Sequence, residues 1–194
     1  TVLFDDFEHT DTLLLFGHNP GTNHPRMLAE LRECAKRGAT IVSINPLRER
    51  GLEQFTDPQS PLEMITFSGT DLCSVFVQPK IGGDIALIKA MAKGILELDA
   101  AAVKANEERV LDLDFIATHT LGFEDFAKDL TNTRWDELVE LSGVPYKQIE
   151  ALTKIYARGK RVISTWGMGI TQNKHALATI QLLSNLMMMR GNIG

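Results

Sequence analysis

Short, mainly apolar runs alternate along this chain with longer segments whose apolar residues recur at helical spacing. Four such runs are predicted to be strands: residues 13–16, 39–44, 72–77 and 161–166. The first is apolar throughout, as is typical of a strand covered on both faces of a sheet. Helical spacing predicts helices over three main segments: residues 25–37, 85–96 and 176–189. This alternation of strand and helix predicts an α/β fold.

The first strand–helix–strand unit spans residues 13–44 and is expected to form a parallel pair with a right-handed crossover. The fold predicted is a Rossmann-like open, mainly parallel sheet flanked by helices. Residues 51–71 form a long excursion, and residues 97–160 are expected to be helical. Four acids in the helical region are most simply a solvated face: Glu97, Asp99, Glu107 and Glu108.

A polar loop follows each predicted strand, at 17–26, 45–51, 78–84 and 167–172. Ligands of open parallel sheets bind outside the carboxyl ends of the strands, so these loops predict a binding rim. Gly17 and Gly21 leave room for close approach of a ligand to the backbone. An ordinary strand-to-helix connection explains the first loop equally well. For Gly167 and Gly169, a ligand is favoured over packing alone.

Asp84 is predicted at the N-cap of the helix over 85–96, where simple capping would contribute about 1 kcal/mol. A second role is recognition of a base. A carboxylate can accept hydrogen bonds from both N1–H and N2–H₂ of guanine, and adenine offers no such pair of donors.

Composition narrows the classes of protein that remain. The chain has 194 residues, 44% hydrophobic and 23% charged, as expected for one globular domain. Its net charge of −5, with no dense basic patch, argues against nucleic acid, and no apolar run is long enough for a membrane span. Cys34 and Cys73 match no metal-ligand spacing and are expected to be buried free thiols.

No arrangement of side chains points to catalysis. The histidines at 18, 24, 119 and 175 are scattered, so each is expected to be a polar contact or a surface residue. No catalytic triad, carboxylate pair or CxxC motif is present, so the site is interpreted as one for binding. The chain starts at Thr1 and stops at residues 191–194, Gly-Asn-Ile-Gly, so an excised piece of a longer protein is expected.

Five motifs in order resemble one family. They are GHNPGTNHP at 17–25, VSINP at 42–46, KIGGDIAL at 80–87, WGMGITQ at 166–172 and RGNIG at 190–194. Together they look like the molybdopterin oxidoreductases of the formate dehydrogenase alpha-subunit type, within the dimethyl sulfoxide reductase superfamily. The resemblance covers nearly the whole chain.

The resemblance implies a multidomain enzyme that holds molybdenum or tungsten on two molybdopterin guanine dinucleotides. Residues 1–194 would be a single domain that binds one dinucleotide. Its implied contacts are Gly17, Asn19 and Thr22 in the first loop, Asn45 at the nucleoside, Gly82 and Gly83 at the phosphates, Asp84 at guanine, and Gly167, Met168, Gly169, Thr171 and Gln172 on the pterin side.

The same resemblance places several functions outside this chain. In the family the metal-ligating residue, any iron–sulfur cluster and the proton-handling residues lie elsewhere, so the fragment should not catalyse a reaction alone. Its partners would be the missing domains of the same chain and an electron-transfer protein, in the cytoplasm. Formate dehydrogenases often have Asp-Pro-Arg after the second strand, whereas residues 45–47 are Asn-Pro-Leu, which leaves formate specificity open.

Two other functions compete with this interpretation. A self-contained regulatory module could bind NAD or ADP, although GxGxxG and an acidic residue at the end of the second strand are both missing. A structural or interaction domain could also have kept the loops without a ligand. Retention of Asp84 beside Gly82 and Gly83 argues against that alternative.

Overall fold

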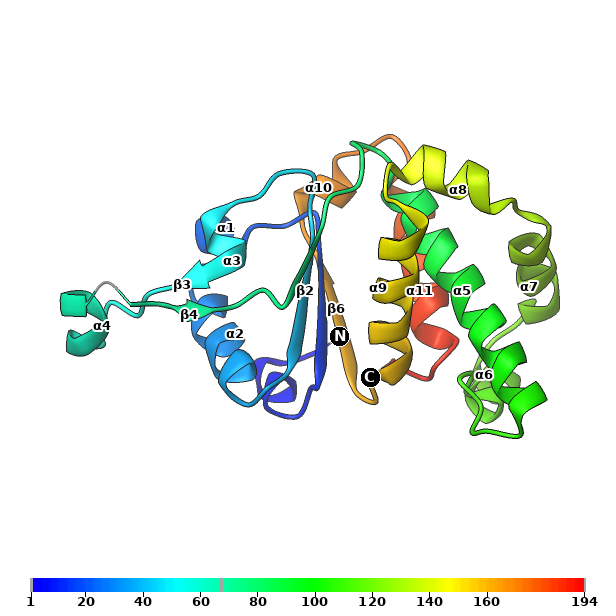
Figure 1. The fold of residues 1–194 in the computed structure, drawn as a ribbon, viewed down its shortest axis with the longest axis horizontal. Coiled ribbons are helices and arrows are strands. Elements are labelled where there is room, and N and C mark those ends of the chain that lie inside the picture. Colours follow the sequence, from blue (N-terminus) through cyan, green and yellow to red (C-terminus); the bar gives the residue numbers. More distant parts are fainter. Residues whose placement is uncertain (1, 67, 194) are drawn as a thin grey trace. The chain divides into compact units, whose positions relative to one another are not determined.

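The computed structural model describes residues 2–66 and 68–193, which fall into two compact units (Figure 1). Unit 1 takes the described residues up to Gln78 together with Gly159–Thr171. Unit 2 takes Pro79–Arg158 and the described residues from Gln172 onward. Each unit is therefore built from two separate stretches of the sequence.

Unit 1 is built on a four-stranded sheet in the order β5-β2-β1-β6. Its strands are β1 (Thr12–Phe16), β2 (Thr40–Ile44), β5 (Val75–Val77) and β6 (Val162–Trp166). All three pairings are parallel, which confirms the predicted α/β fold with its parallel sheet. In this register Phe16 lies beside Ile44 and Trp166, so the loops after β1, β2 and β6 leave the same edge.

One face of the sheet is covered by a short 3₁₀ helix, η1 (Phe4–Glu8), and by α2 (Met27–Lys36), which form its core layer. Leu13 and Ile41 from the sheet and Leu31 from α2 have no exposed surface. Burying each of these side chains stabilises the unit by roughly 1.5–3 kcal/mol. Gly38 ends this region at a φ of +86°, as expected for the residue after a helix.

The loop after β1 differs from the expected open connection because it contains a short helix, α1 (Pro20–Asn23). Asn19 caps α1, since its Oδ1 accepts a hydrogen bond from the Thr22 N–H at 3.3 Å. The helix predicted from Pro25 begins at Met27 instead. The cap therefore shapes the first loop before α2 starts.

The excursion after β2 forms a small substructure of its own. It contains α3 (Arg50–Glu53), β3 (Gln54–Phe55), α4 (Pro61–Thr66) and β4 (Thr70–Asp71), with β3 and β4 antiparallel. The strand predicted over 72–77 is shortened to Val75–Val77, because the Leu72 N–H donates to the Glu53 carbonyl at 2.8 Å. Cys73 is only half-buried as a result, whereas Cys34 is buried as predicted.

Unit 2 is a helical layer around the long helix α5 (Asp84–Ala105). Its other helices are α6 (Leu113–His119), α7 (Phe123–Asn132), α8 (Trp135–Ser142), α9 (Tyr146–Arg158) and α11 (Ala176–Met188). α5 packs against α7, α8, α9 and α11, and its Leu87, Ile88 and Met91 are fully buried. Among the described residues, none of the helices combines the length and apolarity that a membrane span requires.

One of the four acids expected on a solvated face is instead internal. Asp99 is only 3% exposed. Its Oδ1 accepts hydrogen bonds from the backbone N–H groups of Val110 and Leu111 at 2.9 and 3.0 Å, and Arg109 pairs with its other oxygen. The carboxylate thus fastens the segment after α5 back onto that helix, a long-range role that charge patterning could not reveal.

Candidate functional site

A cavity of about 170 Å³ lies in unit 1 at the carboxyl edge of the sheet. Its walls come from the loops after β1, β2 and β6 and from α10 (Met168–Thr171). The lining residues are Gly17, His18, Asn19, Asn23, His24, Asn45, Glu49, Gly167, Met168 and Gly169. Six of the residues predicted from the sequence therefore meet in one place, from three separate loops.

Two further predicted residues of unit 1, Thr22 and Thr171, are exposed and do not line this cavity. The backbone N–H of Thr22 is committed to the cap at Asn19. Gln172 belongs to unit 2, as do Gly82, Gly83 and Asp84. The structure thus supports Thr22 as a residue that shapes the loop.

The glycines at the rim of unit 1 allow one loop backbone to contact another. The Gly169 N–H donates to the Gly17 carbonyl at 2.9 Å, and Gly17 has a φ of +55°. A Cβ on Gly169 would lie 2.6 Å from the Gly17 oxygen, and a Cβ on Gly21 would lie 2.6 Å from the Gly51 Cα. Packing is therefore a sufficient reason for these glycines. From the sequence, packing was the less favoured reason for Gly169, whereas an ordinary connection explained Gly17 and Gly21 as well as a ligand did.

His18 is the most enclosed ionisable group of the cavity, at 6% exposure. Its ring meets that of His24 edge-to-face, with 5.2 Å between centroids, and its Nδ1 has no hydrogen-bond partner among the described residues. Burial, reinforced by the charge of His24, lowers the pKa of His18 to about 4. The imidazole is therefore neutral at pH 7. The sequence pattern had predicted a polar contact or a surface residue here, and it carries no signal for this burial.

Asn45 and Glu49 form the part of the wall that follows β2. The Asn45 amide nitrogen donates to the Leu47 carbonyl at 2.7 Å and to Glu49 Oε2 at 3.1 Å. Asn45 was predicted as a site residue, whereas Glu49 was not. A carboxylate four residues beyond an asparagine at a strand end is the only sequence signal for this contact.

Asp84 begins α5 in unit 2 but does not cap it, contrary to the sequence prediction. Gly83 is the N-cap residue, and no side chain accepts a capping hydrogen bond there. Asp84 is 8% exposed and its Oδ1 has no partner among the described residues. Burial raises the pKa of this carboxyl, and its own backbone N–H acts in the opposite direction.

The two glycines of the turn before α5 are required for different structural reasons. Gly82 has a φ of +80°, a conformation that glycine adopts without strain. A Cβ on Gly83 would lie 2.8 Å from the Ser142 carbonyl oxygen, so the close approach of α8 requires glycine there. This turn therefore holds the buried Asp84 carboxylate in a fixed place within unit 2.

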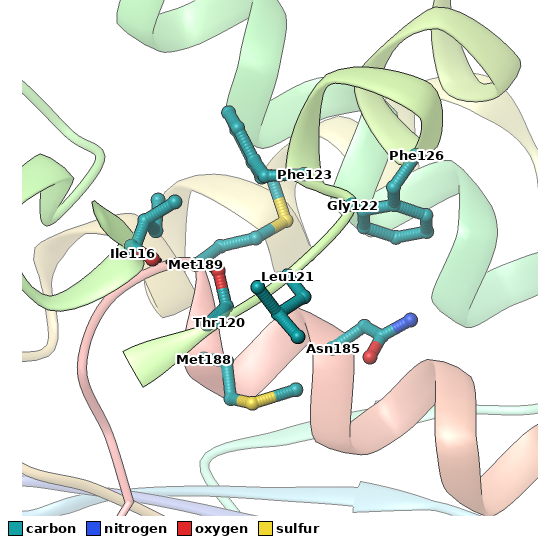
Figure 2. A pocket seen from close by; sticks show the side chains of 9 residues that line it. All are labelled: Ile116, Thr120, Leu121, Gly122, Phe123, Phe126, Asn185, Met188 and Met189. Carbon is teal, nitrogen blue, oxygen red and sulfur yellow. Dashed lines mark hydrogen bonds between the residues drawn. The ribbon is translucent and has the colours of Figure 1, made fainter. Parts of the chain in front are cut away.

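A second cavity in unit 2, of about 100 Å³, contains none of the predicted site residues (Figure 2). It lies between the loop that joins α6 to α7 and the end of α11, with Leu121, Phe126 and Met188 in its wall. Leu121 is fully exposed. Its mainly apolar lining offers no group for acid–base or metal chemistry. Over the described residues, no cluster of three metal-ligating side chains is present.

The fold and the rim cavity define an α/β domain of the kind that binds a ligand at the carboxyl edge of a parallel sheet. Residues 2–194 match the model of one family, Molybdopterin oxidoreductase. The chain belongs to the molybdopterin oxidoreductase family, as its motifs indicated.

Relatives of the chain support this assignment. It is 50% identical over 194 residues to Protein YdeP of Escherichia coli strain K12, covering 26% of that protein. It is 27% identical over 190 residues to Formate dehydrogenase H of the same organism, covering 23% of that protein. The chain therefore spans about a quarter of the length of these relatives.

The fold is also that of a solved structure. Acetylene hydratase from Pelobacter acetylenicus superimposes with a TM-score of 0.74 at 18% identity, over 95% of this chain and 22% of that protein. At this identity the likeness concerns the fold.

Proposed function

We propose that this chain is the domain of a molybdenum- or tungsten-dependent oxidoreductase that binds one molybdopterin guanine dinucleotide. The parent would be a formate dehydrogenase-like alpha subunit. When bound, the cofactor supplies the metal and the redox chemistry. This chain supplies binding and orientation, and it is not catalytic alone.

The observation that carries the proposal is the unsatisfied carboxylate oxygen of Asp84. A buried acceptor with no partner is unfavourable by about 1–3 kcal/mol, so such groups usually meet a donor in the functional state. Guanine fits because its N1–H and N2–H₂ present two adjacent donors to one carboxylate. Gly82 and Gly83, which precede Asp84, would approach the phosphates.

Within unit 1, the loops at the carboxyl edge of the sheet carry groups that suit a nucleoside or a pterin. Their cavity contains amide, imidazole and backbone groups that can bind polar edges of a nucleoside or a pterin. Gly17 and Asn19 would line the first loop near the dinucleotide, Asn45 would contact its nucleoside part, and Gly167, Met168 and Gly169 would approach the pterin side. Thr22 in the first loop, and Thr171 and Gln172 on the pterin side, complete the proposed set.

Nucleotide binding by the full-length protein, produced without cofactor, tests the proposal. At a GDP concentration about 100 times its dissociation constant, binding should stabilise the protein by roughly 2.7 kcal/mol in a thermal-shift experiment. We expect a shift with GDP, little with ADP or NAD, and loss of the GDP shift in Asp84→Ala.

A matched control is Asp112→Ala, which removes an aspartate that caps α6 through the Phe115 N–H. This variant should keep the GDP-dependent shift even if its melting temperature falls. A shift with ADP or NAD and none with GDP would reject the proposal in favour of an adenine-nucleotide module.

A further inference from the structure

The carboxylate of Glu49 is a cavity group that the proposed cofactor contacts do not yet use. Glu49 precedes α3 but makes no capping hydrogen bond to it. Its Oε2 instead accepts a hydrogen bond from the Asn45 amide nitrogen, which also donates to the Leu47 carbonyl. Both amide protons are thereby engaged in holding the loop and its carboxylate against the cavity.

The charge balance of this wall disfavours a phosphate. The ten described residues that line the cavity include one carboxylate and no lysine or arginine. Arg48 and Arg50 flank Glu49 in the sequence, and neither lines the cavity. Arg48 pairs with Glu53 at 3.3 Å and lies over the Phe76 ring at 5.0 Å. A negative oxygen in a cavity lining that contains no lysine or arginine favours a neutral group that donates hydrogen bonds.

The hydroxyl pair of a ribose has this chemistry, since its two adjacent O–H groups can both donate to one carboxylate. In dinucleotide-binding sheets, an acidic residue after the second strand of the fold commonly binds the ribose. Here the residue that directly follows β2 is Asn45, and the carboxylate of Glu49, four residues later, folds back to accept a hydrogen bond from its amide. Glu49 therefore supplies to the cavity the carboxylate that is missing directly after β2.

We propose that Glu49 binds the 2′- and 3′-hydroxyls of the nucleotide, and that Asn45 is a positioning residue that holds the Glu49 carboxylate. This assignment rests on the proposed function, which it deepens by naming the ribose contact. It predicts that the site distinguishes a ribonucleotide from one without these hydroxyls.

Binding of GDP and of 2′,3′-dideoxy-GDP to the full-length protein without cofactor tests this assignment by titration calorimetry. Hydrogen bonds to a charged acceptor predict that GDP binds at least about tenfold more tightly than the dideoxy analogue. Glu49→Gln should weaken GDP binding to the level of the analogue and leave the analogue unaffected. Asn45→Ala should reduce the same hydroxyl preference.

Glu53→Gln is the matched control, because Glu53 lies in the same segment, pairs with Arg48 and does not line the cavity. It should keep the full preference for GDP. Melting temperatures close to wild type would show that each variant is folded.

The outcomes separate the two proposals. Tight GDP binding without any hydroxyl preference, or a preference that survives in Glu49→Gln, would overturn the role of Glu49 and leave the guanine proposal standing. Preferential binding of ADP, with a ribose preference lost in Glu49→Gln, would support Glu49 and reject guanine. Absence of binding by either nucleotide to the wild type would overturn both.

Discussion

Enclosure in the rim cavity changes the pH at which a side chain takes up a proton. His18 is the clearest case, because burial lowers its pKa from the ordinary value of 6.5 to about 4 and so keeps the imidazole neutral at pH 5, where an isolated histidine is protonated. Its Nδ1 is buried and has no hydrogen-bond partner among the described residues, so this atom is available to a ligand group. Enclosure of this kind couples the stability of unit 1 to pH.

The first prediction concerns this coupling. A folded-state pKa of about 4 lies below the ordinary value near 6.5, so the unfolded chain takes up the proton first as the pH falls. Stability should therefore drop by roughly 1–2 kcal/mol between pH 7 and pH 5. In His18→Gln this part of the drop should disappear, measured by urea unfolding at both pH values.

The exposed His119 provides the comparison. His119→Gln should leave the pH dependence as in the wild type. Equal pH dependence in His18→Gln and the wild type would contradict the proposed burial of a neutral imidazole.

For single residues, the sequence predicted the position of the candidate site more reliably than the role of each residue in it. Gly17, Asn45 and Gly169 were expected on one rim, and the structure brings them to one cavity. Asp84 was expected to cap α5, but Gly83 takes that position. Burial of His18 depends on contacts between loops, which local sequence patterns do not encode. The approach of Glu49 to Asn45 depends on how the loop after β2 folds, and the four-residue spacing is its only sequence signal.

Among the elements, α5 organises unit 2, and its last turns are fastened by one buried carboxylate. Asp99 accepts the N–H groups of Val110 and Leu111, which lie beyond the end of the helix. Burial alone would raise the pKa of Asp99, but the guanidinium of Arg109 and the two N–H donors outweigh it and lower the pKa. The connection between α5 and α6 depends on this group.

The second prediction is that Asp99→Ala destabilises the protein by roughly 2–4 kcal/mol, because it leaves buried N–H groups without an acceptor. Since the pKa of Asp99 is lowered, its contribution is present at neutral pH and is lost as the pH falls below about 4. Urea unfolding at pH 7 measures the loss.

Asp136→Ala is a suitable control, because the carboxylate of Asp136 and the Arg134 guanidinium that pairs with it are both largely exposed. Its unfolding midpoint should stay close to that of the wild type. A comparable loss in both variants would contradict a special role for Asp99.

Elements with a strong period were predicted well, and elements set by long-range contacts were not. The runs at 13–16 and 161–166 became β1 and β6. The first is apolar throughout, and the second begins with the buried residues Val162 and Ile163. Only the second half of the run at 72–77 became a strand, because the Leu72 N–H donates a hydrogen bond to the Glu53 carbonyl in the segment after β2. α1 was missed because four residues are too few to show a period.

At the scale of the whole molecule, the chain leaves unit 1 after Gln78, returns for β6 and leaves again after Thr171. Unit 1 therefore needs β6 beside β1, and unit 2 needs α11 beside α5. Local periodicity cannot predict that the chain returns to a unit it has left, because this depends on which distant segments pack together.

The third prediction is that a fragment of residues 1–158 folds into neither unit, because it lacks both β6 and α11. Its amide resonances should show poor dispersion in a ¹H–¹⁵N spectrum, compared with the 194-residue chain. Adding a peptide of residues 159–194 should restore dispersion. A well-dispersed spectrum from the fragment alone would contradict the interleaved arrangement.

The backbone contacts between Gly17 and Gly169 and between Gly21 and Gly51 have a further consequence for recognition. They lock the loops after β1, β2 and β6 to one another before any ligand arrives. Walls that are already ordered lose little conformational entropy on binding, so more of the interaction energy appears as affinity. The rim of unit 1 is therefore preorganised, and we expect its loops to keep the same conformation when the ligand binds.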